Sequence, residues 1–255
     1  MKSNLKFIHL PLTCALIFGA LLCAQSVFAE KVFKSGIEQT SLLELYTSQG
    51  CYSCPPAENW LNALKDSPEL WSQVVPVAFH VDYWDYLGWK DPYGMKRNQQ
   101  RHYAYKFQGH TNAIYTPEVI LNGADYTIWR QGEAPRLPAT SNVGELELSI
   151  DDEKGIRVFF SSREKSTAAL KANIALLGFG IVAKIAAGEN DGKTLHHEFV
   201  ALEQNSKTAH PVGQLYLWQF PNIESSHARE RSALIAWLDK EGDNRPIQAT
   251  GGWID

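Results

Sequence analysis

Hydrophobic spacing along the first half of the chain switches repeatedly between the period of strands and that of helices. The short apolar run Ser41–Thr47 ends at a Ser-Gln-Gly turn and predicts a buried strand. Apolar residues recur at helical spacing from Pro55 onward, so a helix is expected to begin at the cysteines just before it. Val74–Val81 predicts a second buried strand, and the spacing within Asp91–Phe107 predicts a second helix.

A further strand and a hairpin are predicted next. Thr116–Gly123 opens at a proline and closes at an Asn-Gly turn, with Tyr126–Trp129 as the expected hairpin partner. The resulting order of strand, helix, strand, helix, strand, strand favours an α/β domain over residues 30–138. Prolines and small polar residues around Ala139 predict a linker, and we place the domain boundary there.

Beyond this linker the spacing is mostly that of strands. Five alternating or apolar runs, separated by turn residues, predict a compact antiparallel sheet. These runs are Glu145–Asp151, Ile156–Ser162, Lys171–Ala187, Leu195–Gln204 and Gly213–Phe220. The run Arg231–Asp239 is too short for its periodicity to decide between a last helix and a last strand. Residues 139–255 are therefore expected to form a β-rich, sandwich-like domain.

The N-terminal segment predicts export. Two lysines precede the apolar run Leu10–Cys23, and Val27–Ala29 offers small residues for signal peptidase. We interpret residues 1–29 as a signal peptide and expect a periplasmic or secreted protein, without stable membrane insertion after its removal. A membrane anchor and a lipoprotein anchor at Cys23 are the alternatives, but the apolar run is short and the residues before Cys23 are bulky.

Composition narrows the classes of partner. The net charge of −4 and the absence of a long basic run argue against nucleic acid. Removal of the signal peptide takes two of the four cysteines with it and leaves only Cys51 and Cys54. The remaining chain is long enough to bury a substantial core, so it does not depend on a disulfide for stability.

The spacing of Cys51 and Cys54 permits reversible disulfide chemistry. On the first turn of a helix, residues three apart share one side, and their sulfurs come within disulfide reach. The helix N-terminus is expected to lower the pKa of the Cys51 thiol below its free value of about 8.5, which makes Cys51 the attacking sulfur. Cys54 would then resolve the mixed disulfide. A static staple is the alternative, although so small a loop gains little stability.

Three runs of sequence resemble a known family. LELYTSQGCYSCPPAE (Leu43–Glu58), AFHVDYWDYLGWKDPY (Ala78–Tyr93) and YTPEVILNG (Tyr115–Gly123) look like the exported thioredoxin-like family catalogued as domain of unknown function 1223. The resemblance implies a thioredoxin-like fold with an added β-rich part, and a CxxC pair at the redox position. It also implies that Pro117 is a cis-proline facing the cysteines and that the backbone of Thr116 pairs with a bound polypeptide.

Residues near the pair are expected to support it. Tyr52 and Ser53 separate the two cysteines. His80, Asp82 and Trp84 come where a parallel strand should end, which is the edge at which α/β sheets bind ligands. His80 or Asp82 could carry protons during thiol exchange or help to bind a partner. The alternative is that Trp84 caps the core while the acids stay solvated.

Three functions fit these features. The first is an exported thiol–disulfide oxidoreductase that acts on a protein or a small thiol or disulfide, with no cofactor beyond its own Cys51–Cys54 disulfide and no metal. The second is a periplasmic copper or zinc binding protein with Cys51, Cys54 and His80 as ligands. The third is a non-catalytic binding module with a structural disulfide. A CxxC pair that follows a strand, in an exported chain without other thiols, favours the first.

Overall fold

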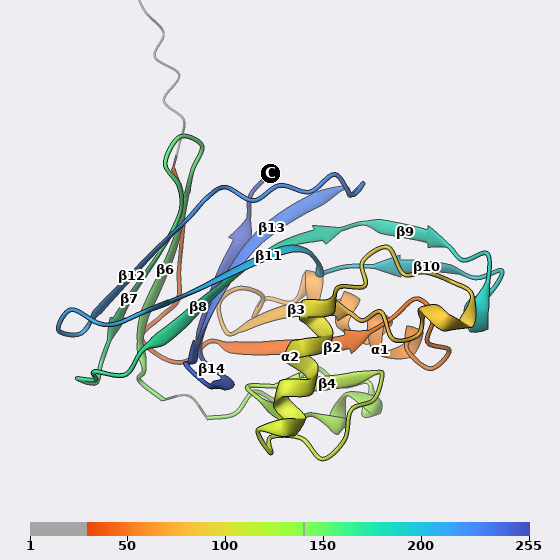
Figure 1. Cartoon of the computed structure of the whole chain (residues 1–255), viewed down its shortest axis with the longest axis horizontal. Helices are drawn as coiled ribbons and strands as arrows, with labels where there is room; N and C mark the ends of the chain where they lie inside the picture. Colours follow the sequence, from red (N-terminus) through yellow and green to blue (C-terminus); the bar gives the residue numbers. More distant parts are fainter. Residues whose placement is uncertain (1–29, 140) are drawn as a thin grey trace, which may run out of the picture.

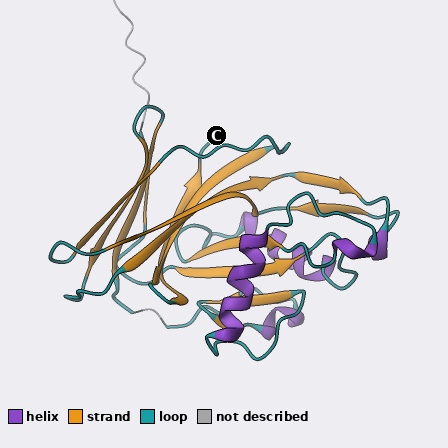
Figure 2. Cartoon of the chain, viewed as in Figure 1, coloured by secondary structure: helices purple, strands orange, loops and turns teal. Residues whose placement is uncertain are grey.

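The computed structural model describes residues 30–139 and 141–255, and β-structure dominates it (Figure 1, Figure 2). The expected signal peptide, residues 1–29, lies outside the described residues. The described part contains fourteen strands and two α-helices, α1 (Pro55–Asn62) and α2 (Lys96–Phe107). Four short 3-10 helices complete its elements: η1 (Ala63–Asp66), η2 (Asp85–Leu87), η3 (Thr127–Gln131) and η4 (Gly188–Asn190).

The strands of the described residues form three sheets. One has eight strands in the order β14-β13-β8-β11-β3-β2-β4-β5, one has four in the order β1-β6-β7-β12, and β9 pairs with β10. The strand bounds are β1 (Lys31–Lys34), β2 (Ser41–Thr47), β3 (Val74–His80), β4 (Glu118–Leu121), β5 (Ala124–Asp125), β6 (Gly144–Asp151), β7 (Gly155–Ser162), β8 (Leu170–Phe179), β9 (Ile181–Lys184), β10 (Thr194–His197), β11 (Val200–Ala209), β12 (Leu215–Phe220), β13 (Arg231–Lys240) and β14 (Asp243–Trp253).

The expectation of a thioredoxin-like α/β domain followed by a separate β-rich domain is wrong. The early strands and helices do form, but their sheet does not end with them, because β11 pairs in parallel with β3 and antiparallel with β8. Strands β8, β13 and β14 extend the same sheet. The segment around Ala139 has no helix or strand from 132 to 139, and strands on both sides of it share the eight-stranded sheet. The architecture is a mostly β, sandwich-like fold.

Strand β13 lies between the two larger hydrophobic cores of the described residues. Ile235 and Trp237 belong to a core shared with β2, β3 and α1. Leu234 and Leu238 belong to a second core, which the four-stranded sheet closes on its other side (Figure 1). Alternate side chains of a strand point to opposite faces, so a strand that is apolar at almost every position is buried on both sides.

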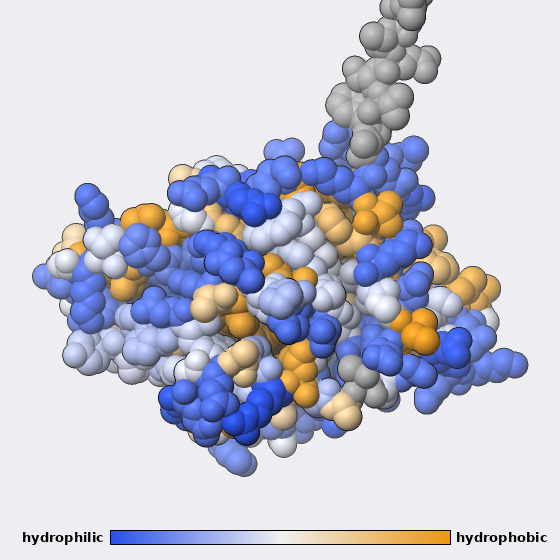
Figure 3. Space-filling model, turned by 180° about the vertical axis from the view of Figure 1, so that it is seen from behind, coloured by the Kyte–Doolittle hydropathy of each residue, from blue (hydrophilic) through white to orange (hydrophobic). Residues whose placement is uncertain are grey.

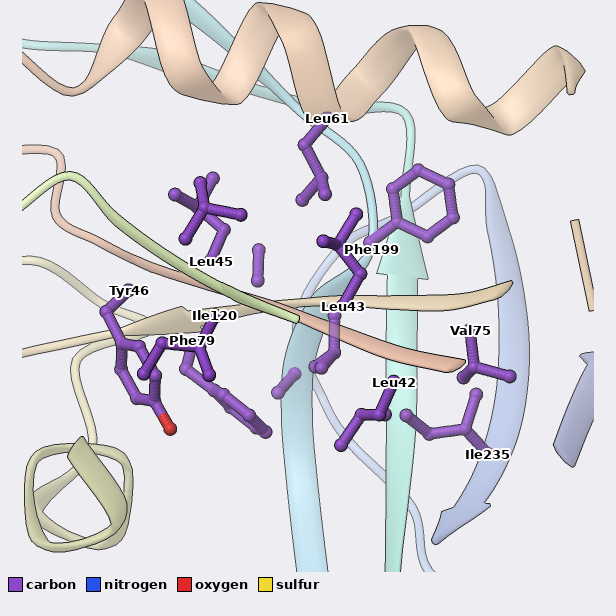
Figure 4. Close-up of a cluster of buried hydrophobic side chains, with 14 of the residues drawn as sticks. Leu42, Leu43, Leu45, Tyr46, Leu61, Val75, Phe79, Ile120, Phe199 and Ile235 are labelled. Atoms are coloured by element: carbon purple, nitrogen blue, oxygen red, sulfur yellow. The ribbon is translucent and has the colours of Figure 1, made fainter. Parts of the chain in front are cut away.

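Helices α1 and α2 cover opposite faces of the sheet around β2. Leu43 and Leu45 of β2 lie toward α1, where Leu61 packs against them, and Leu42 and Tyr46 lie on the other side (Figure 4). Strands β2 and β3 are parallel, so both end at the edge of the sheet where α1 begins. This edge holds the cysteine pair.

Three local predictions need correction, and one open choice is resolved. α1 begins at Pro55, after the cysteines, and α2 begins at Lys96 rather than at the start of the polar stretch. The hairpin partner of β4 is β5, directly after the Asn-Gly turn, whereas Tyr126–Trp129 turns away into η3. A two-residue turn places the very next residues opposite the strand, which explains the shift. Arg231–Asp239 lies within a strand, β13.

The surface mixes polar and apolar residues. On the face shown in Figure 3, hydrophobic residues form small groups between hydrophilic ones. Large exposed hydrophobic side chains include Tyr86, Phe107 and Val212, which are far apart in the sequence. Neither α-helix of the described residues is long and apolar enough to cross a membrane.

Candidate functional site

Cys51 and Cys54 form a disulfide in the turn between β2 and α1. Their sulfur atoms are 2.11 Å apart and their Cα atoms 5.4 Å apart. The Cys54 N–H donates to the Cys51 carbonyl at 3.2 Å, which closes the turn. Pro55 and Pro56 occupy the first helical positions, where a backbone N–H is not needed. The helix starts at these prolines, so Cys51 precedes it and Cys54 is its N-cap residue. The expectation that both cysteines lie on the first turn of the helix is therefore wrong.

Both cysteines are enclosed. The exposed fraction is 1% for Cys51 and 0% for Cys54, whereas the intervening Tyr52 is 65% exposed. Polar atoms lie close to the pair, since the Cys51 sulfur is 3.6 Å from the Ser53 hydroxyl. Any reaction at sulfur therefore requires one of the covering segments to move.

The segment before β4 forms one wall of the site. The Thr116–Pro117 peptide bond is cis, as expected. The Ser53 hydroxyl donates to the Thr116 carbonyl at 3.4 Å, and the Trp84 indole N–H donates to the Thr116 hydroxyl at 2.7 Å. Gly50 permits the approach of Trp84, because a Cβ at this position would lie 3.1 Å from the Trp84 Cβ. The structure thus gathers most of the predicted supporting residues beside the disulfide.

The turn η4, from the second half of the chain, covers another side of the site. The Asn190 side-chain amide donates to the carbonyls of Gln49 and Cys51, both at 2.9 Å. The Tyr52 N–H donates to the Glu189 carboxylate at 3.1 Å, and the Lys193 ammonium lies 4.3 Å from the centre of the Tyr52 ring. The sequence shows this segment only as a turn, so its role at the site was missed.

His80 lies at the end of β3 and is completely buried. Its Nδ1 is 2.7 Å from Asp91 Oδ2, which also accepts the Gln49 N–H, while Asp91 Oδ1 accepts the Tyr93 N–H. Burial lowers the pKa of His80, but the carboxylates of Asp91 and Glu58 outweigh it and leave this pKa raised. Burial raises the pKa of Asp91, but His80 and the two N–H donors outweigh it and leave this pKa lowered.

Glu58 and His197 extend this buried group. Glu58 lies one turn after Cys54 on α1, and the Glu58 N–H donates to the Cys54 carbonyl at 3.1 Å. One Glu58 oxygen is 2.8 Å from His197 Nδ1, and the other accepts from the Thr47 hydroxyl. Burial raises the pKa of Glu58, but the imidazoles of His197 and His80 outweigh it and leave this pKa lowered. One donor atom each from Glu58, His80 and His197 lies within 4.8 Å of the others.

Gln49 joins the buried group to the cysteine turn. Its backbone N–H donates to Asp91, and its carbonyl accepts from Asn190. Its side-chain Nε2 lies 3.1 Å from His197 Nε2, and its Oε1 accepts the Trp89 indole N–H at 2.9 Å. Because an indole N–H can only donate, it fixes the orientation of this amide, so that Gln49 donates to His197.

The structure does not bring every predicted site residue into this group. Over the described residues the Asp82 carboxylate makes no hydrogen bond or ion pair, so it lies outside the group. The cysteines are joined to each other, and the cluster of potential metal ligands that the described residues form contains His80 but neither cysteine. Sequence reasoning missed Glu58 and His197. The four-residue spacing from Cys54 could have pointed to Glu58, which must share its helix face, but no local pattern connects His197 to the site.

The comparison with protein families decides the family. A family profile described as "protein of unknown function (DUF1223)" matches residues 42–239. This chain belongs to the DUF1223 family. The matched range includes the cysteine turn, the buried group and η4. No curated protein sequence matches the chain.

Two solved structures resemble the DUF1223 chain. A protein of Agrobacterium tumefaciens gives a TM-score of 0.56 at 22% identity, over 83% of this chain and 92% of that one. HBP35 of Porphyromonas gingivalis gives a TM-score of 0.54 at 13% identity, over 87% of this chain and 77% of that one. At these identities the likeness concerns the fold alone.

Proposed function

We propose that this DUF1223 protein is an exported thiol–disulfide oxidoreductase that uses Cys51 and Cys54. Its substrate would be a protein or a small molecule that carries a thiol or a disulfide, and its place the periplasm or the cell exterior. The observation that carries the proposal is the disulfide itself, which closes a four-residue turn at the start of α1 among polar side chains. Such a turn lets the two sulfurs meet or separate with little backbone movement.

A purely structural role explains this disulfide poorly. By the loop-entropy account, the stabilisation by a disulfide grows with the length of the loop that it closes, and a loop of fifteen residues gains about 3 kcal/mol. The loop between Cys51 and Cys54 contains only two residues, and both cysteines already lie within a well-packed fold. The pair therefore adds little stability, whereas its geometry suits exchange.

In the reducing direction, a Cys51 thiolate attacks one sulfur of a substrate disulfide. A bond forms between Cys51 and that sulfur, and the other substrate sulfur leaves as a thiolate and takes a proton. The Cys54 thiolate then attacks the Cys51 sulfur, and the second substrate sulfur leaves in the same way. The substrate gains two electrons, and the protein returns to the disulfide. The reverse sequence oxidises a dithiol.

Exchange requires the cover of Cys51 to open. Its carbonyl is held by Asn190, and the neighbouring Tyr52 N–H is held by Glu189. Both hydrogen bonds come from one short turn, η4, so a movement of η4 would break them together. We place substrate access between η4 and the wall formed by Thr116 and Trp84, because these segments bound the cysteine turn.

Trapping of mixed disulfides tests the proposal. The full chain, with its own N-terminal segment, is expressed as Cys54→Ser and as Cys51→Ser, and periplasmic extracts are separated without reductant. Cys54→Ser should accumulate adducts that a reductant releases, because the attacking sulfur remains and the resolving sulfur is gone. Cys51→Ser serves as the matched control and should accumulate none.

Trapping requires that the expression host contain a substrate, so a second measurement uses the purified protein alone. The purified wild-type protein is equilibrated in glutathione buffers of graded potential, and the fraction of free thiol is counted. A reversible two-electron transition supports the proposal. Absence of adducts with both variants, together with a disulfide that no buffer reduces in the folded protein, would show that the pair is a static staple.

A further inference from the structure

Two imidazole nitrogens in the buried group lack hydrogen-bond partners. Neither His80 Nε2 nor His197 Nδ1 makes a hydrogen bond within the described residues, and both side chains are at least 98% buried. His197 Nδ1 lies only 2.8 Å from Glu58 Oε2, yet the pair is not aligned as a hydrogen bond. Buried polar atoms nearly always make hydrogen bonds, so two imidazole nitrogens that make none beside one carboxylate point to a missing ligand.

The charges of the group point the same way. Glu58 and Asp91 are 4% and 2% exposed, and no lysine or arginine of the described residues forms an ion pair with either. Two buried carboxylates therefore have only imidazoles as basic neighbours. Buried charges in proteins are paired or coordinate metals, and a divalent cation would balance both carboxylates at once.

From the ligand atoms and their surroundings, we propose that Glu58, His80 and His197 form a binding site for a divalent metal ion, zinc by the type of its ligands. Two imidazole nitrogens and one carboxylate oxygen are a common zinc set, and a fourth position would remain open. The donor atoms lie within 4.8 Å of one another, so small side-chain movements bring them to one ion. None of these atoms belongs to a cysteine, so the site does not depend on the redox state of the disulfide.

The neighbours of the three ligands fit an outer shell. Asp91 holds the proton of His80 on Nδ1 and leaves the lone pair of Nε2 for the metal, as carboxylates commonly do for histidine ligands. The Thr47 hydroxyl bonds the Glu58 oxygen that does not face His197. Glu58 also lines a surface pocket of about 440 Å³ with Pro55, Asn59, Lys193, Thr194, Leu195 and His196, which provides an entry path.

Loading of the site should disturb Gln49. In the structure Gln49 donates to His197 Nε2, which places the proton of a neutral His197 on Nδ1. A metal at Nδ1 shifts this proton to Nε2, so Gln49 must turn its oxygen toward His197. Trp89 then loses the acceptor of its indole N–H. The indole N–H resonance of Trp89, assigned through Trp89→Phe, should therefore shift when the metal binds.

Metal titration of the oxidised protein tests the inference. Zn²⁺ added to the metal-free, disulfide-bonded chain should bind one ion per chain, measured by calorimetry. Co²⁺ in its place should give visible d–d bands without a thiolate charge-transfer band. His197→Gln should weaken zinc binding by more than about 100-fold, and Asp91→Asn by about 10- to 100-fold. His210→Gln is the matched control, because this exposed histidine follows β11 and belongs neither to the group nor to the lining of the pocket, and it should bind like the wild type.

The outcomes separate this site from the cysteine pair. Unchanged zinc binding by the Cys51→Ser, Cys54→Ser double variant supports the buried site, and loss of binding in that variant overturns it. Absence of both binding heat and a cobalt spectrum with the wild-type protein overturns it as well, whatever the variants do. If His197→Gln fails to fold, the wild-type cobalt spectrum and the Trp89 resonance decide. Failure of the disulfide trapping leaves these measurements untouched.

Discussion

At the scale of single residues, Arg101 joins α2 to two strands of the eight-stranded sheet. Its guanidinium donates to Glu44 of β2 and to Asp239 of β13, each at 2.9 Å, and to the Tyr105 hydroxyl at 2.8 Å. Burial lowers the pKa of Arg101, but Asp239 and Glu44 outweigh it and raise this pKa well above its usual value, so the group stays charged. One cation thus serves two buried carboxylates from distant parts of the chain.

Replacement of Arg101 should be strongly destabilising. Arg101→Ala leaves Glu44 buried without a cation and leaves Asp239 with only the Lys171 ammonium, 3.5 Å away. Breaking a buried pair in this way costs about 3–5 kcal/mol. Arg97→Ala is the matched control, since Arg97 lies one turn earlier on the same helix but is exposed, and it should cost less than about 1 kcal/mol. Urea unfolding measures both. Equal losses for the two variants would show that the buried network contributes nothing specific.

At the scale of elements, the β9–β10 hairpin connects the second half of the chain to the candidate site. Its turn η4 covers the cysteines, and β10 supplies His197 to the buried group. Side chains alternate along β10, which exposes His196 and buries His197. One hairpin therefore both covers the disulfide and supplies a histidine to the buried group.

Weakening of this cover should speed reduction of the disulfide. Asn190→Ala removes two hydrogen bonds that hold η4 to the cysteine turn, each worth about 0.5–1.5 kcal/mol. If reduction proceeds through an opened state, the loss raises its rate by roughly tenfold or more, since 1.4 kcal/mol corresponds to a factor of ten. Asp191→Ala, an exposed neighbour, should leave the rate unchanged. Dithiothreitol reduction followed by thiol counting gives both rates, and equal rates would mean that η4 is no cover.

The sequence predicts most elements of this fold but not how they are joined. Ser41–Thr47 and the cysteine turn follow from local spacing, because a buried strand and two consecutive prolines leave their mark within a few residues. The pairing of β11 with β3 cannot be predicted from local sequence, because the apolar residues at the start of β11 could pack beside any buried strand. The candidate site divides in the same way. Thr116 and Trp84 lie in recognisable motifs, whereas Asn190 and His197 reach the site only through tertiary structure.

At the scale of the whole molecule, the two halves share both a sheet and a core. Phe199 and Ile235, from the second half, pack beside Leu42 and Leu43 of β2 (Figure 4). The family profile covers both halves as well. The elements around the cysteines thus have no closed core of their own, because one face and one edge of their sheet are completed by later strands.

Isolation of the first half should therefore abolish folding. A chain of residues 30–138 loses Phe199, Ile235 and Trp237 from its core, and burial of each such side chain contributes about 1.5–3 kcal/mol. Their combined loss of roughly 5–9 kcal/mol is comparable with the whole stability of a typical domain, 5–15 kcal/mol. The cut also exposes the edge of β3, which pairs with β11 in the intact chain. We expect this fragment to lack cooperative thermal unfolding by circular dichroism, while residues 30–255 unfold in one transition. A cooperative transition in the fragment would instead show that the cysteine turn belongs to an independently folding domain, which does not need η4 or His197 to fold.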